Sequence, residues 1–382
     1  MGDTQKHTKP NVPNLRFPGF EGEWEKVTIG QICNIVGGGT PDTNTKEYWN
    51  GGIQWFTPSE VGKEKYVSDS NRTVSVEGLK SSSAKLLPPY SILLSSRATV
   101  GECSINLKEC CTNQGFQSAV PNMDITATEF LYYRLLTHKR EFIKKACGST
   151  FLEISAKQIS KHNTFIPARA EQEKIADLLS MIDQRIAIQN KIIERYQSLI
   201  RAITKDLVIT DGKPVKLGDI AEIYQPRTIS VRQMTSKGKY PVYGANGIIG
   251  HYSDYNHATE QICIACRGNT CGVVNYSKPF SWITGNSMVI NVDQSAKAKL
   301  INKRYLFHLL STVDYTPLVS GSGQPQIVRG PLRKMNVVLP CIEKQILVAQ
   351  LLDAMAERHE MEKEIMSRWV AQKQALLNQL FI

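Results

Sequence analysis

Ile166-Pro167-Ala168-Arg169-Ala170-Glu171-Gln172 opens the stretch that decides the fold, residues 166–207. After this opening, a ladder of mostly apolar residues recurs at alternating steps of four and three. Its positions are Ile175, Leu179, Ile182, Ile186, Gln189, Ile193, Tyr196, Ile200, Ile203 and Leu207. This 3.5-residue period is typical of a coiled-coil seam rather than of an ordinary amphipathic helix. The pattern therefore predicts one long helix over residues 171–207.

The same ladder occurs a second time near the C-terminus. Adding 173 to each number gives Val348, Leu352, Met355, His359, Glu362, Met366, Trp369, Lys373, Leu376 and Leu380. The helix starts match as well, because Pro167 corresponds to Pro340 and Gln172 to Gln345. Recurrence at this distance indicates two copies of one large unit, each ending in a long helix.

Four polar residues interrupt the two ladders: Gln189 in the first, and His359, Glu362 and Lys373 in the second. A buried polar residue in a seam can select the partner and its register. Alternatively, the true seam drifts along the helix. For the second helix we favour a drifting seam, because apolar residues offer an alternative stripe at Leu351, Met361 and Ile365.

Before each long helix, short strands and helices are mixed, which predicts α+β domains. Expected strands cover residues 53–57, 91–95, 101–107, 164–166, 262–265 and 273–276, and expected helices cover 130–146 and 305–310. Glycine-containing loops at 148–150 and 321–323 again lie 173 residues apart. The predicted organisation is an arm at 1–13, a first domain at 14–166, a helix at 167–209, a linker at 210–213, a second domain at 214–339 and a helix at 340–382.

Length and charge limit the classes of function. The chain has 382 residues, a net charge of +11 and no run of eighteen apolar residues. Its N-terminus lacks the apolar core of a signal peptide, and its nine cysteines show no disulfide-like spacing, so we expect a cytoplasmic protein. The positive charge is uneven: residues 14–166 carry +2 and residues 214–340 carry +8. This excess favours a polyanionic partner.

A search for catalytic chemistry finds no centre. Leu87-Pro88-Pro89-Tyr90 has leucine where an amino-methyltransferase needs a hydrogen-bonding side chain. Cys263, Cys266 and Cys271 lack the fourth ligand of a structural zinc site, and no phosphate-binding loop is present. We therefore expect a protein without enzymatic activity, metal or cofactor.

Several basic and polar residues are candidates for binding a polyanion. Arg97 and Arg267 fall in corresponding hairpin turns, where an arginine can reach a guanine edge or a phosphate. A solvated arginine, or one bridging to a local carboxylate, explains the pattern equally well. Two further groups are candidate DNA contacts: Lys63, Lys65 and Arg72, which acidic residues interleave, and Gln324, Gln326 and Arg329 in a glycine-containing loop.

Two motifs carry a family resemblance. Gly38-Gly39-Thr40-Pro41 with Tyr48-Trp49-Asn50-Gly51-Gly52-Ile53-Gln54-Trp55, and Pro241-Val242-Tyr243-Gly244-Ala245-Asn246-Gly247-Ile248-Ile249-Gly250, resemble the target-recognition domains of type I restriction-modification specificity subunits. Both helix starts are similar to that family's, although Lys344 stands where the first copy has Glu171.

The resemblance implies a DNA-reading scaffold without a cofactor or catalytic residue. Each domain would read one half of a bipartite target in double-stranded DNA. The two helices would pair as an antiparallel coiled coil and dock two methyltransferase subunits, which motor-nuclease restriction subunits then join. The expected pairing seam consists of Ile175, Leu179, Ile182, Ile186, Ile193, Tyr196, Ile200 and Ile203 with Val348, Leu352, Met355, Met366, Trp369 and Leu376.

Two alternatives remain open from sequence. The chain can be a stand-alone DNA-binding protein with tandem heads, which would need no exposed apolar surface for partners. It can also be an enzyme whose site has no recognisable motif, which activity of the isolated chain would reveal.

Overall fold

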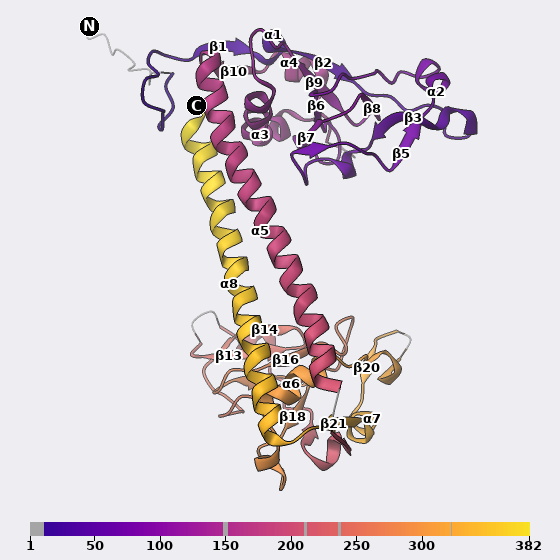
Figure 1. Ribbon diagram of the computed structural model, residues 1–382, viewed down its shortest axis with the longest axis vertical. Coiled ribbons are helices and arrows are strands. Elements are labelled where there is room, and N and C mark those ends of the chain that lie inside the picture. The colour runs from indigo at the N-terminus through magenta and orange to yellow at the C-terminus, as the bar shows by residue number, and fades with distance from the viewer. Residues whose placement is uncertain (1–10, 148–151, 210–211, 236–237, 322) are drawn as a thin grey trace. The chain divides into compact units, whose positions relative to one another are not determined.

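The computed structural model describes residues 11–147, 152–209, 212–235, 238–321 and 323–382, which divide into two compact units (Figure 1). Unit 1 contains the chain up to Gln189 together with Ile365–Ile382, and unit 2 is Asn190–Glu364. The loop expected at 148–150, residues 1–10 of the arm, residues 210 and 211 of the linker and Ser322 lie outside the described residues.

Unit 1 is a mixed α+β domain with the start of a long helix. Its strands are β1 (Glu25–Thr28), β2 (Cys33–Gly37), β3 (Trp49–Phe56), β4 (Tyr66–Val67), β5 (Arg72–Val74), β6 (Ile92–Leu94), β7 (Cys103–Asn106), β8 (Cys110–Thr112), β9 (Gln117–Pro121) and β10 (Asn163–Ile166). Its helices are α1 (Ile29–Ile32), α2 (Val76–Lys80), α3 (Thr128–Lys145) and α4 (Ala156–Ser160), followed by α5 (Arg169–Ile209), which continues into unit 2.

Unit 2 repeats this composition. Its strands are β11 (Lys213–Lys216), β12 (Glu222–Tyr224), β13 (Tyr240–Gly244), β14 (Gly247–Tyr252), β15 (Ile262–Ala265), β16 (Val274–Tyr276), β17 (Trp282–Ile283), β18 (Ser287–Asn291), β19 (Val319–Ser320), β20 (Gln326–Ile327) and β21 (Asn336–Leu339). Its helices include the short 3₁₀ helix η3 (Leu217–Asp219), α6 (Lys303–Ser311) and α7 (Arg329–Lys334), followed by α8 (Ile342–Leu380), which continues into unit 1.

The sheets show that the two units share one topology. Unit 1 has the order β2-β9-β6-β7-β4, and unit 2 has β12-β18-β15-β16. The second sheet of each is built around one central strand, in the orders β5-β3-β8 and β14-β13-β17, with β3–β8 and β13–β17 parallel. An antiparallel pair precedes each long helix, β1 with β10 and β11 with β21. The repeat seen in the sequence is thus a repeat of the fold.

The two long helices pair in opposite directions. In unit 1 the start of α5 lies with the end of α8, where Lys373 Nζ is 2.7 Å from an oxygen of Asp183. In unit 2 the end of α5 lies with the start of α8, and Ile203 packs into the same core as Val348 and Leu352. This arrangement is the expected antiparallel pair.

Burial along the helices follows the predicted ladders. Ile175, Leu179, Ile182, Val348 and Leu352 are buried, and Ile186, Ile193, Tyr196, Ile200, Ile203, Met355, Met366, Trp369 and Leu376 are half-buried. The drifting seam favoured for α8 was wrong. His359 and Glu362 are 9% and 4% exposed, whereas Met361 of the alternative stripe is 48% exposed. A seam predicted from apolar residues alone is misplaced here, because the polar residues His359 and Glu362 occupy it.

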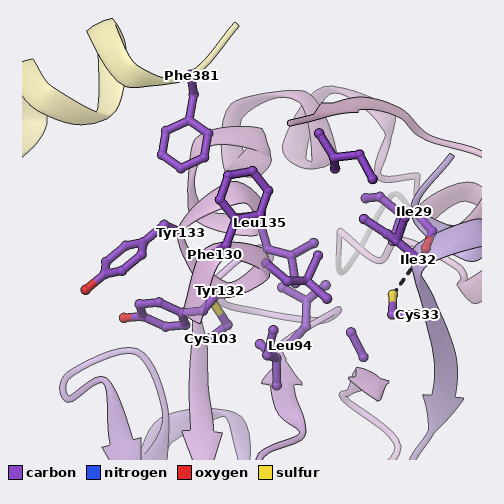
Figure 2. Close-up of a cluster of buried hydrophobic side chains, with 14 of the residues drawn as sticks. Ile29, Ile32, Cys33, Leu94, Cys103, Phe130, Tyr132, Tyr133, Leu135 and Phe381 are labelled. Atoms are coloured by element: carbon purple, nitrogen blue, oxygen red, sulfur yellow. Dashed lines mark hydrogen bonds between the residues drawn. The ribbon is translucent and has the colours of Figure 1, made fainter. Parts of the chain in front are cut away.

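Residues from both ends of the described chain close the core of unit 1. Figure 2 shows Phe381, just after α8, facing Phe130 of α3, with ring centroids 5.4 Å apart. The Trp24 indole packs edge-on against both rings. Arg134 of α3 donates to the backbone oxygen of Ile382, and Leu15 N–H donates to the carbonyl of Gln379. The end of α8 is therefore part of the first domain.

A buried glutamine at the start of α5 ties this helix to α3. The Gln172 side-chain oxygen accepts from the Thr126 hydroxyl at 3.1 Å and from the Ala127 amide at 3.0 Å. Its nitrogen donates to the carbonyls of Ile125 and Pro167. Since Ala127 is the residue that caps α3, one amide group satisfies backbone groups at the starts of both helices.

Gln345 does the same in unit 2. Its oxygen accepts from the amide of Asn302, the capping residue of α6, and its nitrogen donates to the carbonyls of Leu300 and Pro340. Both glutamines are 1% exposed. The glutamine pair that repeats in the sequence is thus a repeated structural junction.

A second polar contact joins α6 to α8 two turns further along. Arg304 donates through Nε to Asp353 at 2.9 Å, and His308 Nε2 lies 2.7 Å from the same carboxylate. Burial opposes ionisation of Asp353, but the hydrogen bonds from Arg304 and His308 outweigh it and lower the pKa of this carboxyl. The contact fixes the angle between the two helices once Gln345 has fixed their starts.

We predict that Gln172→Ala destabilises unit 1 and Gln345→Ala destabilises unit 2. Each substitution leaves several buried backbone groups unpaired, at a total cost of roughly 2–4 kcal/mol. Hydrogen exchange should accelerate at the α3 amides in the first variant and at the α6 amides in the second, so each variant controls for the other. Gln184→Ala, at an exposed position of α5, should leave both units unchanged. Exchange rates of Gln172→Ala equal to those of the parent protein would contradict the proposed junction.

Candidate nucleic-acid interface

The two glycine- and tryptophan-containing motifs of unit 1 form one structure. The Trp55 indole donates to the carbonyl of Gly39 at 3.0 Å, and the Trp49 indole donates to the carbonyl of Asp42 at 3.0 Å. A side chain at Gly38 or Gly39 would collide with neighbouring backbone. The glycines therefore allow the loop to pass close to residues 83–84 and 112–113, while the two tryptophans of β3 hold it by hydrogen bonds.

Arg72 of β5 stacks on this pair. Its guanidinium carbon lies 3.6 Å from the Trp49 ring centroid and 5.6 Å from that of Trp55, while the residue as a whole is exposed. Stacking on an aromatic face holds a guanidinium without neutralising its charge. Of the three residues predicted together in this region, Arg72 is the one that is both held by neighbouring side chains and exposed.

Lys65 lies elsewhere. Its ammonium group is 2.6 Å from the Ser180 hydroxyl of α5 and 3.2 Å from the Tyr133 hydroxyl of α3. Burial lowers the pKa of Lys65. Tyr133 in turn donates to Asp183, which also pairs with Lys373. Lys65 therefore belongs to a network joining the first domain to both long helices, whereas Lys63 is exposed.

Arg97 is paired with a carboxylate. Its Nη2 and Nε lie 2.6 and 3.1 Å from the same oxygen of Glu153. The two side chains are 41% and 37% exposed. Of the alternatives left open by the sequence, the structure shows the bridge to a local carboxylate.

In unit 2, residues predicted separately come together. Arg267 pairs with Gln326 of β20 through an isolated antiparallel bridge, and Gln324 lies two residues earlier on the same loop. Arg267, Gln324 and Gln326 are all exposed. The turn after β15 and the glycine-containing loop thus form a single polar surface, which sequence separation alone did not reveal.

The sequence profile of the type I restriction modification DNA specificity domain matches this chain twice, over residues 21–196 and 210–368. The chain belongs to this family. It is 26% identical to the EcoprrI specificity subunit of Escherichia coli over 365 residues, which cover 88% of each chain. It is 36% identical over 198 residues to the MjaIX specificity subunit of Methanocaldococcus jannaschii, covering 51% of this chain and 45% of that protein.

Solved structures of the family share the fold. The type I restriction-modification S subunit from M. genitalium superimposes with a TM-score of 0.64 at 16% sequence identity, covering 97% of this chain and 99% of that one. A structure from work on complex assembly in a type I system gives a TM-score of 0.61, again over 97% and 99% of the chains, at 15% identity. At these identities the likeness concerns the fold alone.

The remaining predicted residue of this DNA specificity protein, Arg329, is not part of the Arg267–Gln326 bridge. It begins α7 and, with Arg333, lines a hollow of about 230 Å³ that also contains Asp219 and Glu222. Acidic residues in the same hollow offset the charge of these arginines. Arg329 is therefore a weaker candidate for contact with an anion than Arg267.

The described residues of the specificity protein contain one group with the composition of a metal site, His138, Glu141 and His162, whose ligand atoms lie within 4.8 Å of one another. Two cations adjoin it: Lys145 Nζ is 2.6 Å from His162 Nδ1, and Arg134 shares the Thr164 hydroxyl with His138. Burial lowers the pKa of His138 to about 2, which keeps its ring neutral. These cations disfavour a further positive ion, and the rings form a hydrogen-bonded chain instead.

Of the three cysteines that resemble a zinc motif, Cys263 and Cys266 lie in the core and Cys271 is half-buried. Cys263 belongs to β15, and burial raises its pKa to about 12. Cys266 is also buried and accepts a hydrogen bond from Gln225. Neither thiol belongs to the group of possible metal ligands found among the described residues. Within the described ranges, no helix has both the length and the apolar character needed to cross a bilayer.

We predict that Asp183→Ala destabilises unit 1 by roughly 1–3 kcal/mol, because it leaves the half-buried Lys373 and the Tyr133 hydroxyl without their carboxylate partner. Thermal unfolding and hydrogen exchange in α3 should both report the loss. Asp177→Ala is the matched control, since Asp177 is an exposed residue of the same helix. Equal stability of the two variants would show that the network contributes nothing measurable.

Proposed function

We propose that the chain is the specificity subunit of a type I restriction-modification complex and reads a bipartite sequence in double-stranded DNA, one half per domain. The observation that carries this proposal is the repeated fold: two domains of the same topology, each belonging to the DNA specificity family. Each domain also presents an exposed arginine, Arg72 on the Trp49 ring and Arg267 beside Gln326.

In this proposal the chain does no chemistry of its own. Two methyltransferase subunits modify the DNA at the sequence that the two domains select, and restriction subunits join the assembly. The complex works on chromosomal DNA, which places it in the cytoplasm. The domain boundaries at residues 166 and 339 that we predicted from sequence define the units expected to be exchangeable.

The long helices offer positions for such partners. Ile188 of α5 and Met361 of α8 correspond through the 173-residue repeat, and they are 55% and 48% exposed. Large apolar side chains in equivalent exposed positions favour two docking sites of the same kind, one for each methyltransferase subunit. A stand-alone DNA-binding protein would have no need of them.

The main test is an exchange of domains. Replacing residues 14–165 with the matching part of another family member, such as the E. coli relative, should change one half of the methylated sequence and leave the other half intact. Exchanging residues 214–339 is the reciprocal control and should change the opposite half. Sequencing of methylated adenines in host DNA gives the result. A change in both halves after a single exchange would contradict one reader per domain.

A second prediction concerns the partners. Ile188→Asp and Met361→Asp should each reduce the number of bound methyltransferase subunits from two to one, and the double variant should bind none, because a charge replaces an apolar contact. Native mass spectrometry of the co-expressed complex measures this stoichiometry. Gln197→Asp is the control, since Gln197 is exposed nine residues after Ile188 and therefore faces the opposite side of α5. Two bound subunits in the double variant would exclude this docking surface.

A further inference from the structure

The Arg267 side chain projects from a defined backbone pairing. The amide of Ile327 donates to the carbonyl of Cys266 at 3.0 Å, and the amide of Gly268 donates to the carbonyl of Pro325 at 2.9 Å. These two bonds flank the pair Arg267–Gln326, which makes it a non-hydrogen-bonded antiparallel pair. In such pairs the opposing side chains lie closest together. The residue at position 326 is therefore the direct neighbour of the Arg267 side chain.

Unit 1 contains the same pairing. Arg97 and Glu153 form an isolated antiparallel bridge, and the amide of Ile154 donates to the carbonyl of Ser96 at 3.0 Å. This bond corresponds to the one between Ile327 and Cys266. Glu153 and Gln326 are also separated by 173 residues, the interval of the whole repeat. The two arginines thus occupy equivalent places in two copies of one structure.

The copies differ in the residue opposite the arginine. In unit 1 it is a carboxylate, and Glu153 holds Arg97 in an ion pair. In unit 2 it is the neutral Gln326, and within the described ranges the Arg267 guanidinium has no hydrogen-bond or ion-pair partner. A carboxylate at this distance neutralises an arginine toward a second anion, whereas an amide does not.

The surroundings of Arg267 suit a close anion. The next residue, Gly268, has φ +78°, and a Cβ atom there would meet nothing within 4 Å. Gly323 on the facing loop is similarly open. A bulky ligand can therefore approach this backbone without collision, and the second domain is the one with the excess of positive charge.

We propose that Arg267 contacts a DNA phosphate, and that the residue opposite each arginine decides which domain makes this contact: Gln326 leaves Arg267 available, whereas Glu153 withholds Arg97. The inference rests on the proposed DNA-reading function and deepens it. It assigns an unequal role to two residues that the repeat makes equivalent. A phosphate contact adds affinity and fixes register without reading the sequence.

The test uses the full chain in complex with its methyltransferase subunits. Two probes are needed: a duplex carrying the sequence that the complex methylates, and a duplex of equal length with that sequence scrambled. Affinity is measured as a function of salt concentration for Gln326→Glu and for the paired variants R267A/Q326A and R97A/E153A. The last two remove the equivalent pair from each domain and are matched controls for one another.

We expect Gln326→Glu and R267A/Q326A each to reduce the slope of log affinity against log salt by about 0.9, the contribution of one neutralised phosphate. The same change of slope corresponds to a roughly eightfold loss of affinity at 0.1 M salt. The methylated sequence should not change in either variant. R97A/E153A should leave both slope and affinity as in the parent complex.

Three results would overturn the inference: an unchanged slope in both unit 2 variants, an equal loss in R97A/E153A, or relaxed specificity at one base pair without a change of slope. The last would make Arg267 a base contact. Circular dichroism of each variant checks that the fold is retained. Failure of the proposed DNA-reading function gives a different result from these three, because the parent complex would then bind the two duplexes with equal affinity.

Discussion

The buried glutamine at the start of each long helix is the interaction on which the architecture depends. A helix start leaves amide groups without intrahelical partners, and here two helix starts meet in the protein interior. Glutamine supplies a donor and an acceptor on one side chain, so Gln172 can satisfy groups from both α3 and α5 at once. Glutamate could only accept, and alanine could do neither. The recognition domain is thereby fixed to its helix at a defined point.

Beyond this shared junction the two units use different chemistry at equivalent places. In unit 2, His308 and Arg304 of α6 bind Asp353 of α8. In unit 1, Tyr133 of α3 donates to Asp183, and Lys65 reaches Ser180. Each set holds a domain helix against a long helix a few turns from the glutamine. The geometry is therefore preserved while the residues that maintain it diverge, which explains why the sequence repeat is clear at the junctions and weak between them.

Much of the architecture could be predicted because helical periodicity and repetition are local signals. The predicted strand over 262–265 matches β15, and the predicted helix over 171–207 lies within α5. One feature of the fold that we did not predict lies between strands β1 and β2, where the single helical turn α1 joins them. Propensity cannot locate such a turn when tertiary packing of Ile29 and Ile32 produces it.

The candidate site was less predictable, since its partners are distant in sequence. Arg97 meets Glu153 across 56 positions, and Lys65 meets Ser180 across 115. Lys65 was grouped with Lys63 as a candidate DNA contact, but β4 beside it pairs with β7, and its ammonium group hydrogen-bonds Tyr133 of α3. Conversely, Arg267 and Gln326 were identified separately, and only the bridge between them showed that they form one surface.

The closure of unit 1 by Leu377, Leu380 and Phe381 also sets an order of events during synthesis. The ribosome makes Trp24, Phe130 and Leu179 early, yet the residues that complete their core emerge only after all of unit 2 has been translated. Unit 2, a continuous segment from Asn190 to Glu364, has no such delay. The half of the protein that is made first is therefore finished last. Until then the place of Phe381 against Trp24 and Phe130 stays unfilled.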